Sequence, residues 1–144
     1  MAGKANPCGK MKGAHMNNDR AIIAEWKEGN LAYVTFTERN DLPDLSYLTQ
    51  EYSECTPKER EGYKQHDAER LARYNNGEWY MVVVGCEVRC RPANWTESVL
   101  VGKSYLSGVE SDSTDCIEAA ADEVTDQARE NVKELKAALT INDL

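Results

Sequence analysis

One run of residues, 79–90, constrains the fold more than any other part of the sequence. Its first half, 79–84, is apolar at every position. Its second half alternates, with Cys86, Val88 and Cys90 on one side and Glu87 and Arg89 on the other. Alternation with a period of two is typical of a β-strand, and an apolar run on both sides is typical of a strand that is covered on both faces. The run therefore predicts an inner strand of a sheet.

Two strands and one helix are predicted before this run. Residues 21–27 and 31–37 flank a Gly-Asn turn signal and predict a β-hairpin, although 21–27 alone is also compatible with a short helix. Thr56, Pro57 and Glu59 combine a capping hydroxyl, a proline at the first helical position and a glutamate three residues after the cap. This pattern predicts a helix that runs to Tyr74 and stops at the sequence Asn75-Asn76-Gly77.

The elements after the run complete an α+β fold. After the run 79–90 we expect one more strand, over 98–106, and then a long helix over 115–139. Apolar residues recur along this helix at intervals of three or four and define one face: Ile117, Ala121, Val124, Ala128, Val132, Leu135 and Leu139. The order β-β-α-β-β-α predicts the α+β class, with an antiparallel sheet of about four strands and two helices on one face.

Length and composition set the domain organisation. A chain of 144 residues corresponds to one domain. Residues 1–18 lack apolar periodicity and are predicted to form a flexible N-terminal tail, and 19–144 a single domain. No apolar run approaches the roughly 18 residues that a membrane span requires. Five cysteines, an odd number, favour free thiols in a reducing compartment. We therefore expect a cytoplasmic protein that does not contact a membrane.

The negative charge is concentrated in one stretch. The chain has 25 acidic and 17 basic residues and a formal net charge of −8, which argues against direct binding to nucleic acid. Residues 104–128 contain seven acidic residues and no Lys or Arg. Such a concentration of charge can steer a basic partner. The predicted partner-binding residues are these seven: Glu110, Asp112, Asp115, Glu118, Asp122, Glu123 and Asp126.

The thiols and the acidic loop have simpler interpretations than metal ligands. Cys86 and Cys90 lack the second pair of ligands that a structural zinc site requires, and we interpret them as core thiols. The loop 110–115 lacks the spacing of a calcium-binding loop. Three residues of this region are interpreted as caps of the following helix: Ser111, Ser113 and Thr114.

No catalytic pair is evident either. His66 and Asp67 are adjacent on the predicted helix, so their side chains diverge by about 100° and do not form an acid–base pair. Asp67 and Arg70 have the spacing of an ion pair on a helix surface. The sequence therefore predicts no catalytic residue, no metal and no cofactor.

Several segments taken together resemble a known family. They are Asp44-Leu-Ser-Tyr-Leu-Thr-Gln50, Tyr63-x3-Asp67-x2-Arg70-Leu71-x2-Tyr74-x4-Trp79-Tyr80 and Gly108-Val-Glu-Ser-Asp-Ser113. In this order they resemble a family of small uncharacterised proteins from bacteriophages, prophages and plasmids. This chain has Tyr47 where many members have Trp, and Val109 where they have Ile.

The resemblance covers about residues 30–139 and brings no activity with it. It implies an intracellular accessory gene product of a mobile genetic element. It also implies that Asp67, Arg70 and Trp79 form one partly buried cluster.

The predicted function is that of a small, non-catalytic protein-binding accessory factor that presents an acidic surface to a basic host or phage protein. In its most specific form this factor inhibits a host defence system, as anti-CRISPR or anti-restriction proteins do. Two alternatives stay open. One is a metal-dependent enzyme centred on the loop 110–115, and the other is a homodimeric structural or accessory protein with the long helix at its interface.

Overall fold

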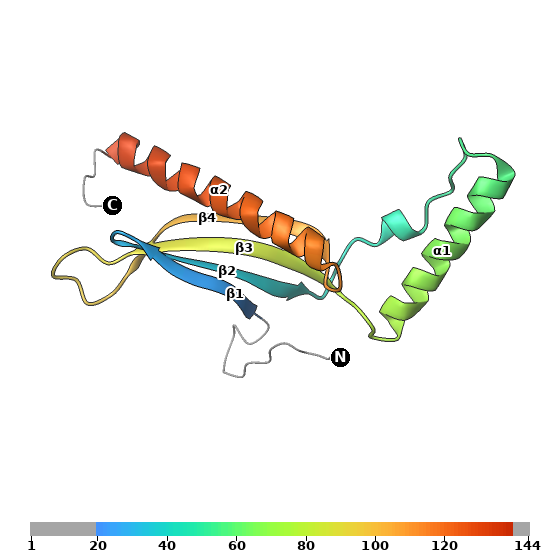
Figure 1. The fold of residues 1–144 in the computed structure, drawn as a ribbon, viewed down its shortest axis with the longest axis horizontal. Helices are drawn as coiled ribbons and strands as arrows, with labels where there is room; N and C mark the ends of the chain where they lie inside the picture. Colours follow the sequence, from blue (N-terminus) through green and yellow to red (C-terminus); the bar gives the residue numbers. More distant parts are fainter. Residues whose placement is uncertain (1–19, 140–144) are drawn as a thin grey trace.

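The computed structural model describes residues 20–139 (Figure 1). Four strands form one antiparallel sheet in the order β1-β2-β3-β4. The strands are β1 (Arg20–Glu28), β2 (Leu31–Asn40), β3 (Met81–Cys90) and β4 (Val99–Glu110). The α+β class, the antiparallel sheet and the element order are confirmed, and the segment 21–27 is a strand. The predicted tail, 1–18, and residues 19 and 140–144 lie outside the described residues.

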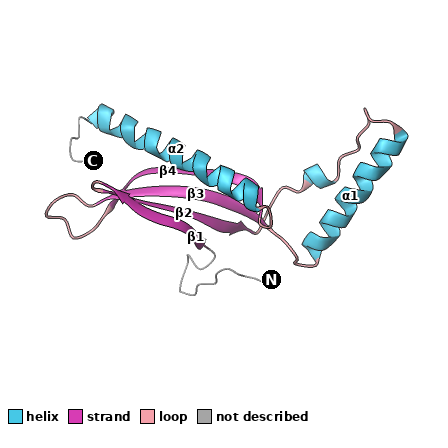
Figure 2. Ribbon diagram, viewed as in Figure 1, coloured by secondary structure: helices cyan, strands magenta, loops and turns pink. Residues whose placement is uncertain are grey.

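The helix α2 (Thr114–Leu139) lies along one face of the sheet, over β3 and β4 (Figure 2). Val124 and Ala128 are almost completely buried and pack against the side chains of β3 that point to the same face. A Cβ added to Gly102 of β4 would lie 2.6 Å from Cγ2 of Val132, so the glycine permits the close approach of α2 to this strand. The main apolar core therefore lies between α2 and the sheet.

The other helix, α1 (Pro57–Asn75), does not lie on the sheet. Together with the short 3-10 helix η1 (Ser46–Leu48) it forms an arm, residues 45–75, which extends beyond the end of the sheet (Figure 1). Of the two helices predicted to cover one face of the sheet, α2 does so and α1 does not. The physical reason is that α1 has few apolar side chains, and two of them, Leu71 and Tyr74, pack on Trp79 and its neighbours instead of on a face of the sheet. The single buried residue of α1 is Asp67, so the helix has no apolar stripe that could pack on a sheet.

The arm has a small apolar cluster of its own. Leu48, Trp79 and Met81 are buried, and Leu71 and Tyr74 of α1 pack against them. The capping box at the start of α1 is confirmed: the backbone N–H of Glu59 donates to Oγ1 of Thr56 at 3.2 Å, and the N–H of Thr56 donates to Oε1 of Glu59 at 3.1 Å. Met81 belongs to both β3 and this cluster, and this is where the arm joins the sheet.

The face of the sheet opposite α2 is covered by no helix of the described chain (Figure 2). Phe36 is nevertheless completely buried there. The guanidinium carbon of Arg20 lies 3.7 Å from the centre of the Phe36 ring, and Tyr105 packs against the ring edge. Val83 on the same face is only half-buried, so the prediction that the first half of β3 is covered on both faces is wrong at this position. In the apolar run, Val82 and Val84 pack towards α2, and Trp79 and Met81 are buried in the cluster with the arm.

The two edge strands carry all the irregularities of the pairing. The register of β1 shifts between Ile22 and Ala24, and that of β4 shifts twice against β3. One of the β4 shifts lies at 107–108, where Gly108 has a φ of 80°. This bulge lets β4 continue to Glu110, beyond the predicted end at 106. Bulges on edge strands hinder pairing with the edge of another sheet.

Candidate functional site

The seven acidic residues of the predicted binding surface fall into two groups. Glu110 ends β4 and Asp112 lies in the turn before α2. The other five lie on exposed positions of α2: Asp115, Glu118, Asp122, Glu123 and Asp126. The two groups have different surroundings, because only the first group meets the arm.

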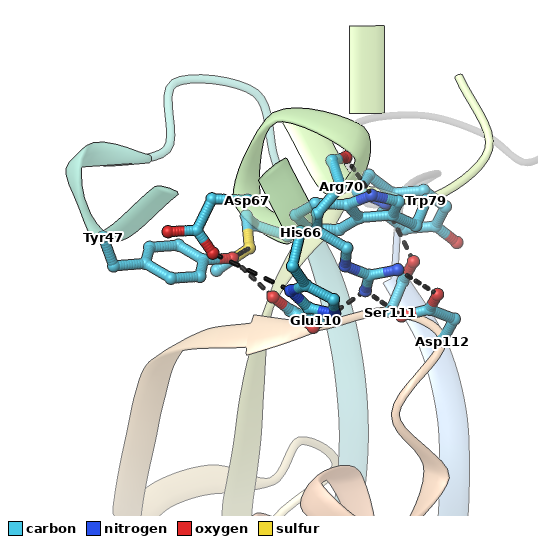
Figure 3. A network of polar contacts seen from close by, with 10 residues as sticks. Tyr47, His66, Asp67, Arg70, Trp79, Glu110, Ser111 and Asp112 are labelled. Atoms are coloured by element: carbon cyan, nitrogen blue, oxygen red, sulfur yellow. Dashed lines mark hydrogen bonds and ion pairs between the residues drawn. The ribbon is translucent and has the colours of Figure 1, made fainter. Parts of the chain in front are cut away.

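Arg70 of α1 binds both carboxylates of the first group (Figure 3). Its Nη2 lies 2.8 Å from Oε1 of Glu110 and 2.6 Å from Oδ1 of Asp112, and its Nη1 lies 2.9 Å from Oδ2 of Asp112. The contact with Asp112 is thus bidentate, which is the strongest geometry for an arginine and a carboxylate. The guanidinium also stacks on Trp79, with its carbon 4.0 Å from the ring centre. We call Tyr47, Arg70, Trp79, Glu110 and Asp112 the Arg70 network.

Tyr47 completes the hydrogen bonding of Glu110. Its hydroxyl donates to Oε2 of Glu110 at 2.6 Å, on the side of the carboxylate that Arg70 does not use. Burial and the adjacent Glu110 carboxylate raise the pKa of Tyr47 well above its ordinary value. The hydrogen bonds from Arg70 hold the pKa of Asp112 below its ordinary value. Both pKa shifts favour the protonation states that these hydrogen bonds require: Tyr47 is a neutral phenol and Asp112 is an ionised carboxylate.

The Arg70 network joins the segments on which the family resemblance rests. Tyr47 comes from the first segment, Arg70 and Trp79 from the second, and Glu110 and Asp112 from the third. Within the second segment, the indole N–H of Trp79 donates to the backbone carbonyl of Arg70 at 3.0 Å. These separate parts of the sequence therefore meet at the junction between the arm and the sheet.

Ser111 supports this junction. Its Oγ accepts a hydrogen bond from the backbone N–H of Tyr80 at 2.9 Å, and its own N–H donates to the carbonyl of Tyr80 at 2.8 Å. The prediction that Ser111 caps the following helix is therefore wrong. The helix begins at Thr114, and the carbonyl of Ser113 accepts the N–H of Ile117. Ser111 lies three residues before Thr114 and pairs instead with Tyr80, the residue that precedes β3.

Asp67 has a different partner from the one predicted. The structure pairs it with the hydroxyl of Tyr52 rather than with Arg70. Nδ1 of His66 lies 3.8 Å from Oδ1 of Asp67, too far for a hydrogen bond, and the imidazole is 78% exposed. His66 and Asp67 thus do not have the geometry of an acid–base pair, as the sequence predicts. Asp67 instead fixes the loop that leads into α1, in which Tyr52 has a φ of 55°.

Four carboxylates on α2 form an acidic ridge: Asp115, Glu118, Asp122 and Glu123. All four are exposed, and none has a hydrogen bond or ion pair within the described part of the chain. Asp126, one turn further on, lies 3.7 Å from Arg129. Arg129 also binds Glu28 of β1, whose pKa it lowers to about 2. The first positive charge that follows the ridge along α2 is therefore already engaged.

A hollow of about 500 Å³ lies beside the ridge, between the end of β4 and the first half of α2. Apolar atoms dominate its wall, with Leu106, Val109 and Ala120 among them. Tyr47 and Glu110 border it on the side of the arm, and Glu123 borders it on the side of the ridge. The thiol of Cys116, an exposed residue, also lines it. The hollow is a largely apolar surface next to the acidic ridge.

The remaining thiols and carboxylates do not suggest a metal centre. Cys86 and Cys90 are buried in β3, which confirms their place in the core, and burial raises the pKa of the Cys86 thiol. Between residues 20 and 139, no group of three or more His, Cys, Asp or Glu side chains could hold a metal ion. In the same range, neither helix has the length and apolar character needed to cross a bilayer.

Comparison of the chain with protein-family models, with curated proteins and with solved structures gives no significant match. The fold and the site are therefore interpreted from their own geometry.

Sequence reasoning missed two features of this site. The first is that Glu110 and Asp112 serve Arg70, which lies 40 residues before Glu110 in the chain. The second is the hollow, which depends on the bulge in β4 and on the path of α2 above it. Both features depend on contacts between residues far apart in the chain, and no local pattern indicates either of them.

Proposed function

We propose that this protein is a non-catalytic binding factor whose acidic ridge on α2 engages a basic surface of another protein. The observation that carries the proposal is the contrast between the two groups of acidic residues. Glu110 and Asp112 are both paired with Arg70, whereas the four ridge carboxylates are exposed and have no partner within residues 20–139.

The like charges of the ridge destabilise α2 when no partner is bound. Glu118 and Asp122 are one helical turn apart, and like charges at this spacing destabilise a helix by about 0.2–0.5 kcal/mol per pair. The opposite side of α2 is fixed against the sheet, so the ridge points outward. A rigid helix that presents uncompensated charge steers a basic partner to one place on the molecule.

The hollow adds a second kind of contact at the same place. Stable interfaces have an apolar centre and a polar rim. Here an apolar depression is bordered by Glu123, a member of the ridge. The combination favours a protein partner over a free ion, because a protein can offer basic and apolar side chains together.

The resemblance to proteins of phages and plasmids supports a setting on a mobile genetic element. In that setting the partner is a host or phage protein, and inhibition of a host defence system is the most specific form of the function. Many proteins of such systems bind nucleic acid and therefore have the basic surfaces that an acidic ridge fits.

The test compares the wild type with the double variant Glu118→Lys/Asp122→Lys. The matched control is Glu61→Lys/Glu69→Lys, which makes the same change of charge at exposed positions of α1. Each protein is used to capture partners from a bacterial lysate over a series of salt concentrations. A captured partner is then purified, and its affinity for all three proteins is measured.

We expect the ridge variant to lose the partner and the α1 control to keep it. Binding of the wild type should weaken steeply with salt, because exposed charges are screened beyond about 8 Å at physiological ionic strength. Equal affinity of the partner for all three proteins would show that the ridge is a solvated helix surface with no role in binding.

A further inference from the structure

The hollow lies at one end of the main core, and two local features open it. Its floor is the part of β4 that contains the bulge at 107–108, where Gly108 has a φ of 80°. Its roof is the first half of α2, which presents Cys116, Ala119 and Ala120 to it. Small side chains on the helix and an extra residue in the strand leave space between the two elements. The space is open to the surface.

The hollow meets the ridge at Ala119 and Glu123. Ala119 is exposed and lines the hollow. Its neighbours on the helix surface, four residues before and three residues after it, are Asp115 and Asp122. Any segment that lies along the ridge therefore passes the mouth of the hollow.

We infer that the hollow binds an apolar side chain, of the size of leucine or methionine, from a lysine- or arginine-rich segment of the partner. The inference rests on the proposed function and specifies the chemistry of the segment that lies on the ridge. The charge of the ridge selects the basic residues of this segment, and the apolar wall selects the side chain between them.

The surroundings of the hollow argue for an apolar occupant and against a cationic one. Glu110, the carboxylate at its inner end, already accepts hydrogen bonds from Arg70 and Tyr47. A cation that entered would therefore compete with Arg70 and Tyr47 for the oxygens of Glu110. The carboxylate of Glu123 at the rim has no partner in the described part of the chain and favours a cation outside the hollow. The pattern fits a helical segment with one apolar anchor and basic neighbours.

Two lysine-rich helical peptides of equal length and charge serve as probes. One carries leucines along one face, and the other carries serines at the same positions. On the wild type we expect the leucine peptide to bind about tenfold more tightly or better, since burial of one large apolar side chain contributes about 1.5–3 kcal/mol. Ala119→Phe fills the mouth of the hollow without a change of charge and should abolish this preference.

The matched control for this variant is Ala138→Phe, an equal substitution at an exposed position near the other end of α2. It should keep the preference for the leucine peptide. Melting temperatures of both variants are measured to establish that they are folded. Equal affinity of the two peptides for the wild type overturns the inference, and so does a preference that survives Ala119→Phe.

Alkylation of Cys116 gives a second measurement that needs no variant. Cys116 lines the hollow and is the single cysteine of the tryptic peptide 104–129, so its modification can be followed by mass spectrometry. The leucine peptide should slow its alkylation severalfold, with no effect on Cys55 in the arm. An unchanged rate at Cys116 with saturating leucine peptide overturns the inference.

The proposed function fails in a different way. If Glu118→Lys/Asp122→Lys binds both peptides as tightly as the wild type does, the ridge has no role, whatever the leucine peptide does at Cys116. If the ridge variant weakens both peptides equally but the wild type shows no preference between them, the ridge stands and the hollow is not a binding site.

Discussion

Two parts of the molecule contact the sheet through different interactions: the helix α2 and the arm. Between α2 and the sheet, a continuous row of buried apolar side chains makes the contact, with Val84, Val88 and Ala128 completely inaccessible. The arm contributes one buried apolar residue, Leu48, to a small cluster with Trp79 and Met81, and its link to the sheet also depends on the Arg70 network. Apolar burial is insensitive to pH and salt, whereas ion pairs depend on both. We therefore expect the arm to open before the sheet unfolds.

The largest expected effect comes from Trp79→Ala, which tests whether the two regions are separable. Trp79 is 2% exposed and contacts Tyr74, and its removal should cost about 3–5 kcal/mol of stability. If the arm opens by itself, alkylation of Cys55 should accelerate strongly while Cys86 and Cys90 stay protected.

Trp95→Ala is the control for this variant, because Trp95 is 57% exposed and lies outside both clusters. It should leave all alkylation rates unchanged. Simultaneous loss of protection at Cys86 and Cys55 in Trp79→Ala would show that arm and sheet unfold as one cooperative unit.

A smaller effect is expected within the sheet, and it separates its two faces. Val124→Ala removes a side chain that is 1% exposed and should cost about 1–3 kcal/mol. Val83→Ala should cost less, because Val83 is half-buried on the face without a helix. Urea denaturation measures both. A larger loss for Val83 than for Val124 would contradict the assignment of the core to the α2 face.

Arg70→Met tests the link between the two regions. The variant keeps much of the apolar side chain over Trp79 but leaves Glu110 and Asp112 without their cation. We expect the arm to lose about 1–2 kcal/mol, since these carboxylates are only partly shielded from water. Hydrogen exchange should quicken in α1 and stay unchanged in β3. Unchanged exchange in α1 would show that the arm does not need the ion pairs.

Acid should have a related but weaker effect on the arm. Arg70 lowers the pKa of Asp112 below its ordinary value of 3.8, so the pair contributes its stability above that pH and loses it as the pH falls through the lower, folded-state pKa. The indole N–H of Trp79 donates to the carbonyl of Arg70, so its NMR signal should shift when acid weakens the pair of Arg70 and Asp112. In Arg70→Met the response of this signal to acid should be weaker. An identical response in both proteins would exclude Asp112 as its cause.

The smallest effect on stability is expected at the ridge. Glu118→Lys/Asp122→Lys should leave the melting temperature unchanged or slightly higher, because it relieves repulsion worth a few tenths of a kcal/mol. A clear fall in melting temperature would show that the ridge carboxylates support the fold. Thermal denaturation at low salt, where surface charges act most strongly, is the sensitive measurement.

Part of the site could be predicted from the sequence, and part could not. The acidic residues of α2 were predicted to be a charged surface, and four of them are exposed and unpaired within residues 20–139. Glu110 and Asp112 were assigned to the same surface because they are close in sequence. Charge along the chain does not show which cation will lie opposite, and Arg70 reaches them from a helix that precedes β3.

The sequence by itself determined the elements and their order. Alternation in 79–90, the Gly-Asn turn, the capping box at Thr56 and the apolar face of α2 are local patterns, and each produced the element that it predicts. Only the tertiary structure decided where α1 lies, which acidic residues stay free and that a hollow opens beside them. Those outcomes depend on contacts between residues far apart in the chain, such as Arg70 with Asp112 and Gly102 with Val132. A local pattern constrains the backbone that carries it, but the partner of a side chain is selected only when the whole chain has packed.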